Sequence, residues 1–283
     1  MNYRHAYHAG NFADVLKHTV VALVIAHLKL KDTPFRVIDT HAGAGLYDLA
    51  GIEAGKTGEW RDGIGRLLGP DAADLPVSMV TLLDPYLAAV RDLNPDGVLT
   101  RYPGSPLLAL ALTRPQDRLI ANELHTADAA ALAAALRRDR RAKILHLDAW
   151  IALKSLLPPR ERRGLILIDP SFEKRDELER LTQALRQATR RFASGTYLLW
   201  YPIKDVSKIA AFRNAVAGEL PRALSVDLMI RAPRDPGKLN GCGLLAINPP
   251  HTLHAKLDAL LPFLVERLAQ GGGASGAIRH LGA

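Results

Sequence analysis

The feature that most constrains the fold is the apolar run at 165–168, which ends on Asp169 and Pro170. A strand that is apolar on both faces is typical of a parallel sheet covered by helices on each side. In open sheets of this kind, ligands bind beyond the carboxyl ends of the strands. We therefore predict an α/β fold whose chemistry lies at Asp169.

Other short apolar runs alternate with helical patterns along the chain. They lie at 35–39, 118–123, 143–148, 196–201, 225–230 and 244–247. Such alternation predicts βαβ units, and 283 residues can bury a large core around them. With the run at 165–168, these segments predict a mostly parallel seven-stranded sheet.

The alternation of strands and helices is interrupted after the first strand. Glycines and a proline break the segment that follows, and its helical pattern ends at Asn94-Pro95. The glycine-rich end of the chain is typical of a flexible segment. We predict a core over 1–46 and 103–270, a small helical insertion over 47–102 and a flexible tail over 271–283.

A glycine turn at 39–45 follows the first predicted strand, with the sequence Asp-Thr-His-Ala-Gly-Ala-Gly. Glycines such as Gly43 permit positive φ and a close approach of the backbone to a ligand. The turn lacks the third glycine of a dinucleotide fingerprint and the Lys-Ser/Thr ending of a phosphate loop. Asp39 and His41 indicate instead a ligand with a positively charged head.

Two further strands end on acids, Glu123 and Asp148, and Ser105 can cap a helix that begins at Pro106. In a nucleoside-binding sheet the first acid binds the ribose hydroxyls and the second binds the adenine amine. The alternative is that each acid only caps the helix that follows it.

The sequence Asp-Pro-Ser-Phe at 169–172 suits the capture of a planar base that carries an amine. The carboxylate of Asp169 and the carbonyl of Pro170 can each accept an N–H, while Phe172 stacks on the base. The alternative is a strand end that caps the next helix. A competing amine-binding sequence, Asn-Pro-Pro-His, stands at 248–251.

The N-terminal segment is polar and aromatic, and an apolar helix predicted over 13–28 follows it. Several of its side chains, and two on the helix, can donate hydrogen bonds to a ligand or stack on it. They are Tyr3, Arg4, His5, Lys17 and His18. The alternative is an ordinary solvated arm. The histidine spacing matches no defined metal site, so we predict none.

The chain carries a formal charge of +8, which favours a polyanionic partner. Basic runs at 137–141, 160–163 and 231–238 suit RNA, although such runs are also typical of solvated faces. The single cysteine, Cys242, excludes an internal disulfide. The N-terminus has no signal pattern, and the apolar run at 19–26 is too short to span a bilayer. We expect a cytoplasmic protein with no membrane contact.

The chain resembles the RlmJ family of bacterial 23S ribosomal RNA adenine-N6 methyltransferases over nearly its whole length. The matching segments are Tyr3-Arg4-His5, His8-Ala9-Gly10-Asn11, the helix start at 13–18, the turn at 39–45, Tyr102-Pro103-Gly104-Ser105-Pro106 and the strand end at 164–170. The resemblance implies a Rossmann-like class I methyltransferase core with S-adenosylmethionine as donor.

The resemblance also implies roles for individual residues. The donor would be bound by His18, His41, Gly43, Ser105, Glu123, Asp148 and Ala149. Asp169 would hold the target amine, with Pro170 and Phe172 beside it, and Tyr3, Arg4 and Lys17 would contact RNA. The implied partner is 23S rRNA, naked or incompletely assembled, methylated at adenine 2030 by a monomeric enzyme.

One departure from the family pattern is Ser171, which stands where the family has a second proline before the aromatic residue. Loss of that proline removes a fixed φ and can loosen the stacking residue. Two alternatives stay open on this evidence. They are a DNA adenine-N6 methyltransferase and a non-catalytic RNA-binding module with a decayed site.

Overall fold

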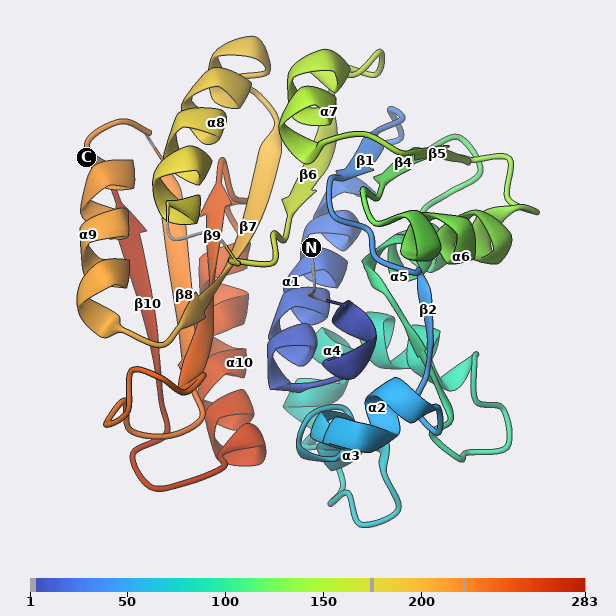
Figure 1. The fold of residues 1–283 in the computed structure, drawn as a ribbon, viewed down its shortest axis with the longest axis vertical. Coiled ribbons are helices and arrows are strands. Elements are labelled where there is room, and N and C mark those ends of the chain that lie inside the picture. The colour runs from blue at the N-terminus through green and yellow to red at the C-terminus, as the bar shows by residue number, and fades with distance from the viewer. Residues whose placement is uncertain (1–3, 174–175, 221, 283) are drawn as a thin grey trace.

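The computed structural model describes residues 4–173, 176–220 and 222–282, and its centre is an eight-stranded sheet (Figure 1). The strand order is β10-β8-β9-β7-β6-β1-β4-β5. The strands are β1 (Arg36–Asp39), β4 (Arg118–Asn122), β5 (Ala142–Leu145), β6 (Gly164–Ile168), β7 (Thr196–Ile203), β8 (Ala223–Met229), β9 (Gly241–Ile247) and β10 (Ser275–Leu281). All seven predicted strands are present, and the α/β prediction is confirmed.

The sheet is parallel from β5 through β4, β1 and β6 to β7. Strand β9 then enters antiparallel between β7 and β8, and β10 pairs antiparallel with β8. Parallel strands end at one edge of the sheet, so the strand-end residues of β1, β4, β5 and β6 gather there. The carboxyl end of β9 lies at the opposite edge.

The eighth strand, β10, corrects the predicted flexible tail over 271–283. Its residues 275–281 pair with β8 throughout, from Ser275 opposite Met229 to Leu281 opposite Ala223. The glycine-rich stretch before it forms only the turn from the last helix, with Gly273 at φ +79. Glycine adopts positive φ without strain, so glycines that indicated flexibility instead allow a short turn from the last helix into β10.

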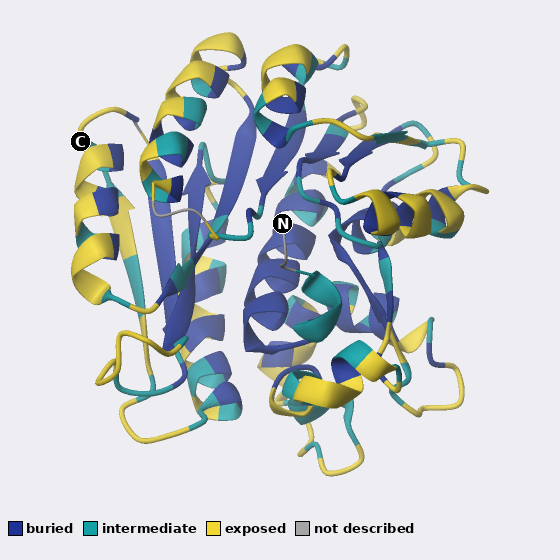
Figure 2. Ribbon diagram, in the orientation of Figure 1, coloured by how far each residue is buried: buried dark blue, intermediate teal, exposed yellow. Residues whose placement is uncertain are grey.

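Helices cover both faces of the sheet. One face carries α1 (Phe12–Leu28), α4 (Val77–Arg91), α5 (Ser105–Leu112), α6 (Thr126–Leu136) and α10 (Leu253–Leu268). The other carries α7 (Ala149–Leu156), α8 (Glu177–Arg191) and α9 (Val206–Ala217). Figure 2 shows the central strands of the sheet as a buried layer between them, while the outermost strand β10 is partly exposed.

Strand β6 explains why its sequence is apolar at every position. Leu165 and Leu167 belong to the cluster on the α1 face, while Ile166 and Ile168 belong to the cluster on the α7–α9 face. Successive side chains of a strand point to opposite faces, so a strand covered on both sides alternates between two cores.

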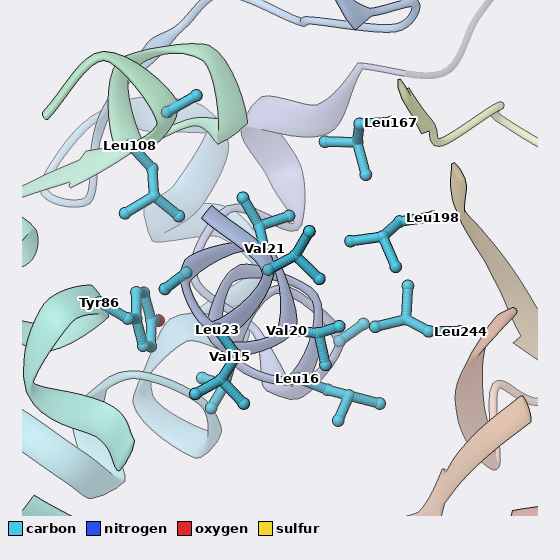
Figure 3. Packing of buried hydrophobic residues seen from close by; sticks show 14 of the residues in the cluster. Val15, Leu16, Val20, Val21, Leu23, Tyr86, Leu108, Leu167, Leu198 and Leu244 are labelled. Carbon is cyan, nitrogen blue, oxygen red and sulfur yellow. The ribbon is translucent and has the colours of Figure 1, made fainter. Parts of the chain in front are cut away.

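Helix α1 is buried on nearly all sides because it lies between the sheet and other helices. Figure 3 shows it between the strand residues Leu167, Leu198 and Leu244 and the helix residues Tyr86 and Leu108. The side chain of Asn11 caps its start by accepting the N–H groups of Ala13 and Asp14. A helix held in this way places its polar residues at fixed positions inside the protein.

The segment between β1 and α5 contains the predicted helix α4 and two short helices that were not individually predicted, α2 (Ile52–Thr57) and α3 (Gly65–Leu68). It also contains an antiparallel pair that was not predicted, β2 (Leu46–Asp48) with β3 (Arg101–Pro103). This pair holds the two ends of the insertion together. Within the described ranges, no helix combines the length and apolarity needed to cross a bilayer.

Candidate active site

A cavity of about 310 Å³ opens at the carboxyl ends of β1, β4, β5 and β6. This is the edge at which the sequence predicts the chemistry. The predicted site residues that line it are Lys17, His41, Gly43, Ser105, Glu123, Asp148, Ala149, Asp169 and Pro170. Strand order brings the strand-end residues together, and helices α1, α5 and α7 add Lys17, Ser105 and Ala149.

Among the residues that the structure describes, carboxylates dominate the charged lining of this cavity. They are Glu123, Asp128, Asp148, Asp169, Glu173 and Glu177, against the two permanent cations Lys17 and Arg180. An enclosed space lined mainly by one sign of charge attracts the opposite sign. The cavity therefore favours a ligand that carries positive charge.

The central contact of the site joins α1 to the end of β6. Lys17 Nζ lies 2.5 Å from Asp169 Oδ2 and 2.8 Å from Asp14 Oδ1, and the side chain is only 5% exposed. Burial alone would lower the pKa of Lys17, but the two carboxylates hold it well above its usual range. Within the described chain, Asp169 Oδ1 accepts no hydrogen bond, so one oxygen of this acid remains available.

This position restricts the RNA contact of Lys17, which stays a prediction, to the part of the RNA that enters the cavity. A buried ammonium held by two carboxylates does not reach a phosphate backbone at the surface. It can meet only a group that enters the cavity beside Asp169.

Sequence reasoning missed Asp14, which is fully buried beside Lys17. Its Oδ2 accepts the Gly10 N–H at 2.8 Å and lies 2.9 Å from His5 Nε2. Burial would raise the pKa of Asp14, but His5 and then Lys17 hold it well below its usual range. The available signal was the spacing, because an acid three residues before a lysine lies on the same helix face.

The glycine turn after β1 is held by hydrogen bonds that involve Glu123, Ser105 and Asp39. Gly43 N donates to Glu123 Oε2 at 2.8 Å and has φ +59, where any Cβ would overlap the Tyr47 hydroxyl. Ser105 Oγ donates to Asp39 Oδ2 at 2.6 Å, and His41 N donates to Asp39 Oδ1. Burial raises the pKa of Asp39 to about 6, against the opposing effect of these hydrogen bonds.

The strand-end acids Glu123 and Asp148 both cap backbone turns and line the cavity. Asp148 Oδ1 accepts the N–H groups of Trp150 and Ile151 at the start of α7. Glu123 accepts from Gly43 N and His125 N. A carboxylate has about four lone-pair sites, so each acid can still accept from a ligand, and the two interpretations are compatible.

The two predicted histidines differ in position. His41 lines the cavity with its ring against Trp150, and burial lowers its pKa to about 4. His18 is fully buried, stacks on Tyr102 and lies 2.8 Å from its hydroxyl. Burial lowers the pKa of His18 to about 3, and its Nε2 has no hydrogen-bond partner among the residues that the structure describes. Its predicted donor contact stays a prediction.

The aromatic residue of the 169–172 sequence is not placed as predicted. Ser171 lines the cavity, but Phe172 is not among its lining residues and packs edge-on against Trp200, with centroids 5.7 Å apart and ring planes 68° apart. Phe172 has φ +52, a conformation that is rare for a large side chain. The structure therefore does not place the Phe172 ring in the cavity beside Asp169.

The remaining predicted residues lie elsewhere. Arg4 pairs with Glu53 at 3.0 Å and Asp128 at 3.2 Å, so its RNA contact stays a prediction, and Tyr3 lies outside the described residues. The competing Asn248 lies at the opposite edge of the sheet, where its amide donates to the Ala193 and Gly195 carbonyls. In the described part of the chain, no group of three or more potential ligands is arranged for a metal.

Comparison with known proteins agrees with this geometry. A family model described as "Ribosomal RNA large subunit methyltransferase D, RlmJ" matches residues 32–278. Ribosomal RNA large subunit methyltransferase J of Escherichia coli (strain K12) is 40% identical over 273 residues, which cover 96% of this chain and 95% of that protein. The protein of the same name from Haemophilus influenzae is 38% identical over 285 residues and covers 99% of both.

A solved structure extends the similarity to the fold. The crystal structure of a Legionella pneumophila protein superposes with a TM-score of 0.88 and 33% identity, over 97% of this chain and 98% of that one. The Rossmann-like fold, the site at the strand ends and the extent of these matches all indicate the same family. The chain belongs to the RlmJ family of ribosomal RNA large subunit methyltransferases.

Proposed function

We propose that this protein transfers the methyl group of S-adenosylmethionine to the N6 amine of an adenine in 23S rRNA. The observation that carries the proposal is the position of Asp169, which lines a cavity rich in carboxylates at the carboxyl ends of the parallel strands. Among the described residues, only Oδ2 of its two carboxylate oxygens is engaged in a hydrogen bond. Family membership supports the reaction class, and the charge of the cavity supports a cationic donor.

The cavity residues fit the donor by their chemistry. S-adenosylmethionine carries a sulfonium and an ammonium group, which suit a space lined by six carboxylates among the described residues. Glu123 would accept the ribose hydroxyls and Asp148 the adenine amine, with the first N–H groups of α7 beside it. Gly43 and Ser105 keep the turn open and in place by the contacts described above.

The target amine is a weak nucleophile, because its lone pair is delocalised into the adenine ring. Asp169 Oδ1 and the Pro170 carbonyl would accept its two hydrogens and favour the pyramidal nitrogen that forms during attack. Lys17 holds Asp169 Oδ2, so it fixes the carboxylate in one orientation. Positioning of two reactants in this way contributes on the order of 7–11 kcal/mol.

Proton removal need not precede methyl transfer. The N6 nitrogen becomes strongly acidic only when it gains the methyl group, and it can then release a proton to solvent or to Asp169. Extrusion of the base from its stack costs a few kcal/mol, which an unpaired adenine reduces.

The finer features of the family resemblance are part of the same proposal. We infer that the methylated nucleotide is adenine 2030, that the substrate is naked or incompletely assembled rRNA, and that the enzyme acts as a cytoplasmic monomer. The second candidate, an RNA-binding module with a decayed site, is favoured by one observation. Phe172 packs on Trp200 instead of lining the cavity.

The test is incubation with donor labelled in its methyl group and one of three substrates: naked 23S rRNA, assembled ribosomes or duplex DNA. We expect label in naked rRNA, recovered as N6-methyladenosine. Label in DNA alone would contradict the proposal, and RNA binding without label in any substrate would favour the decayed site. Mapping of the labelled nucleotide tests position 2030 separately.

A further inference from the structure

A second hollow, of about 230 Å³, lies between α7 and α8 next to the candidate active site. Trp150 and Arg180 line both spaces, so the hollow continues directly from the cavity. It is bounded further along by Lys154 of α7 and Arg191 of α8. We call it the α7–α8 groove, and Figure 1 shows the two helices side by side.

The charge of the groove is opposite to that of the cavity. Its ionisable lining residues are Lys154, Arg180 and Arg191, with Gln183 and Gln187 between them. No carboxylate is among the described residues that line it. The spacing on α8 is helical, because positions 180, 183, 187 and 191 repeat every three or four residues and share one face.

The three cations of the groove are not neutralised by the protein. Within residues 4–173, 176–220 and 222–282, none of Lys154, Arg180 and Arg191 forms an ion pair, whereas Arg186 on the same helix pairs with Glu219. Lys154 and Arg191 are exposed to solvent. Uncompensated cations around a hollow form a site for an anion.

An aromatic ring stands where the groove meets the cavity. The Arg180 guanidinium lies 5.7 Å from the centroid of the Trp150 ring. Aromatic faces beside cations that follow a groove are the elements with which proteins bind single-stranded nucleic acids. From Arg180 to Arg191 the helix rises about 16 Å, which is long enough for several successive phosphates.

We propose that the α7–α8 groove binds the single-stranded RNA segment that flanks the target adenine. Lys154 and Arg191 contact its phosphates, and the flanking base next to the target lies against Trp150 and Arg180. The inference rests on the proposed function, because the strand must leave the cavity in which its adenine is held. Among the described residues, the lining of the groove carries no acid that would repel phosphates, and the groove continues directly from the cavity that holds the target adenine. The RNA strand that flanks the adenine is therefore the occupant that fits.

The test compares the double variant Lys154→Gln/Arg191→Gln with a matched control, Arg190→Gln/Lys208→Gln. The control removes two cations from exposed positions on α8 and α9 that do not line the groove. Affinity for a fluorescent single-stranded fragment of 23S rRNA is measured by anisotropy across a series of salt concentrations. KM and kcat for the same fragment are measured in parallel, and donor affinity is measured by calorimetry.

We expect the groove variant to lose RNA affinity about tenfold. The slope of log K against log salt should fall by about 1.4, because about 0.7 is lost with each phosphate contact on a single strand. KM should rise while kcat and donor affinity stay within twofold of wild type. The control should match wild type in every measurement.

Equal RNA affinities and salt slopes for the groove variant and its control would overturn the assignment. An equal loss of affinity for duplex DNA of the same length would also overturn it, because the groove would then be a general polyanion surface. Neither result depends on turnover. Failure of the wild-type protein to methylate RNA would instead contradict the proposed function, so the two failures are distinguishable.

Discussion

The buried carboxyl group of Asp39 offers a quantitative test of the site, through the change Asp39→Asn. Its pKa is raised to about 6 by burial, from the ordinary value of 3.8. The folded state therefore binds a proton more tightly than the unfolded state. The stabilisation that this proton provides is complete below pH 3.8 and is lost as the pH rises through about 6.

The magnitude follows from the two pKa values. A difference of about 2 units corresponds to about 3 kcal/mol, since each unit is worth 1.36 kcal/mol. Asparagine has a similar shape and carries no charge at any pH, and it can still bond with Ser105 Oγ and His41 N. We expect the unfolding free energy of the Asn variant, relative to that of wild type, to rise by about 2 kcal/mol as the pH increases from 4 to 7, because a carboxyl of pKa 3.8 is already more than half ionised in the unfolded state at pH 4.

The assay is urea unfolding of both proteins at pH steps from 4 to 7.5, followed by circular dichroism. Both proteins share all other titrating groups, so the contributions of those groups cancel in the difference between the two unfolding free energies. A difference that stays constant over this range would refute the reasoning, because Asp39 would then have no raised pKa. A Glu53→Gln variant, changed at a half-exposed carboxyl, serves as the control.

Three further predictions follow from particular contacts. Gly43→Ala should weaken donor binding at least tenfold in calorimetry, because φ +59 and the Tyr47 hydroxyl exclude a Cβ, while Gly97→Ala, also at positive φ but in open space, should not. Arg279→Gln should cost about 1–3 kcal/mol in urea unfolding, since Arg279 Nη1 bonds to the buried Asp227 at 2.6 Å; an unchanged midpoint would contradict this. Asp14→Asn should cost about 3–5 kcal/mol, because it removes one of two carboxylates from a buried ammonium, and the loss relative to wild type should shrink as the pH falls below 3.8.

The strands could be predicted from the sequence because burial on both faces leaves a pattern. Strand β6 is apolar at each position from Leu165 to Ile168, and Asp169, the residue directly after it, lines the cavity. The role of the residues that follow β1, β4 and β5 could be predicted from the same geometry, since parallel strands end at one edge of the sheet and their end residues meet there. These predictions needed no knowledge of side-chain contacts.

Other features depend on distant parts of the chain and left little local signal. Strand β10 is half exposed and follows glycines, so only its pairing with β8 defines it. Lys17 is a typical solvated residue by type, and it is buried only because α1 places it between Asp14 and Asp169. The position of Phe172 depends on Trp200, which the local sequence does not reveal.

The role of Asp169 is tested most directly by the variant Asp169→Ala. N6-methyladenosine formed in naked 23S rRNA is measured by mass spectrometry, and donor affinity is measured by calorimetry on the same preparation. The account predicts donor binding within a few-fold of wild type and loss of at least a thousandfold in the rate of methylation, as expected when a positioning acceptor is removed. Methylation at the wild-type rate would contradict the account and place the target amine elsewhere.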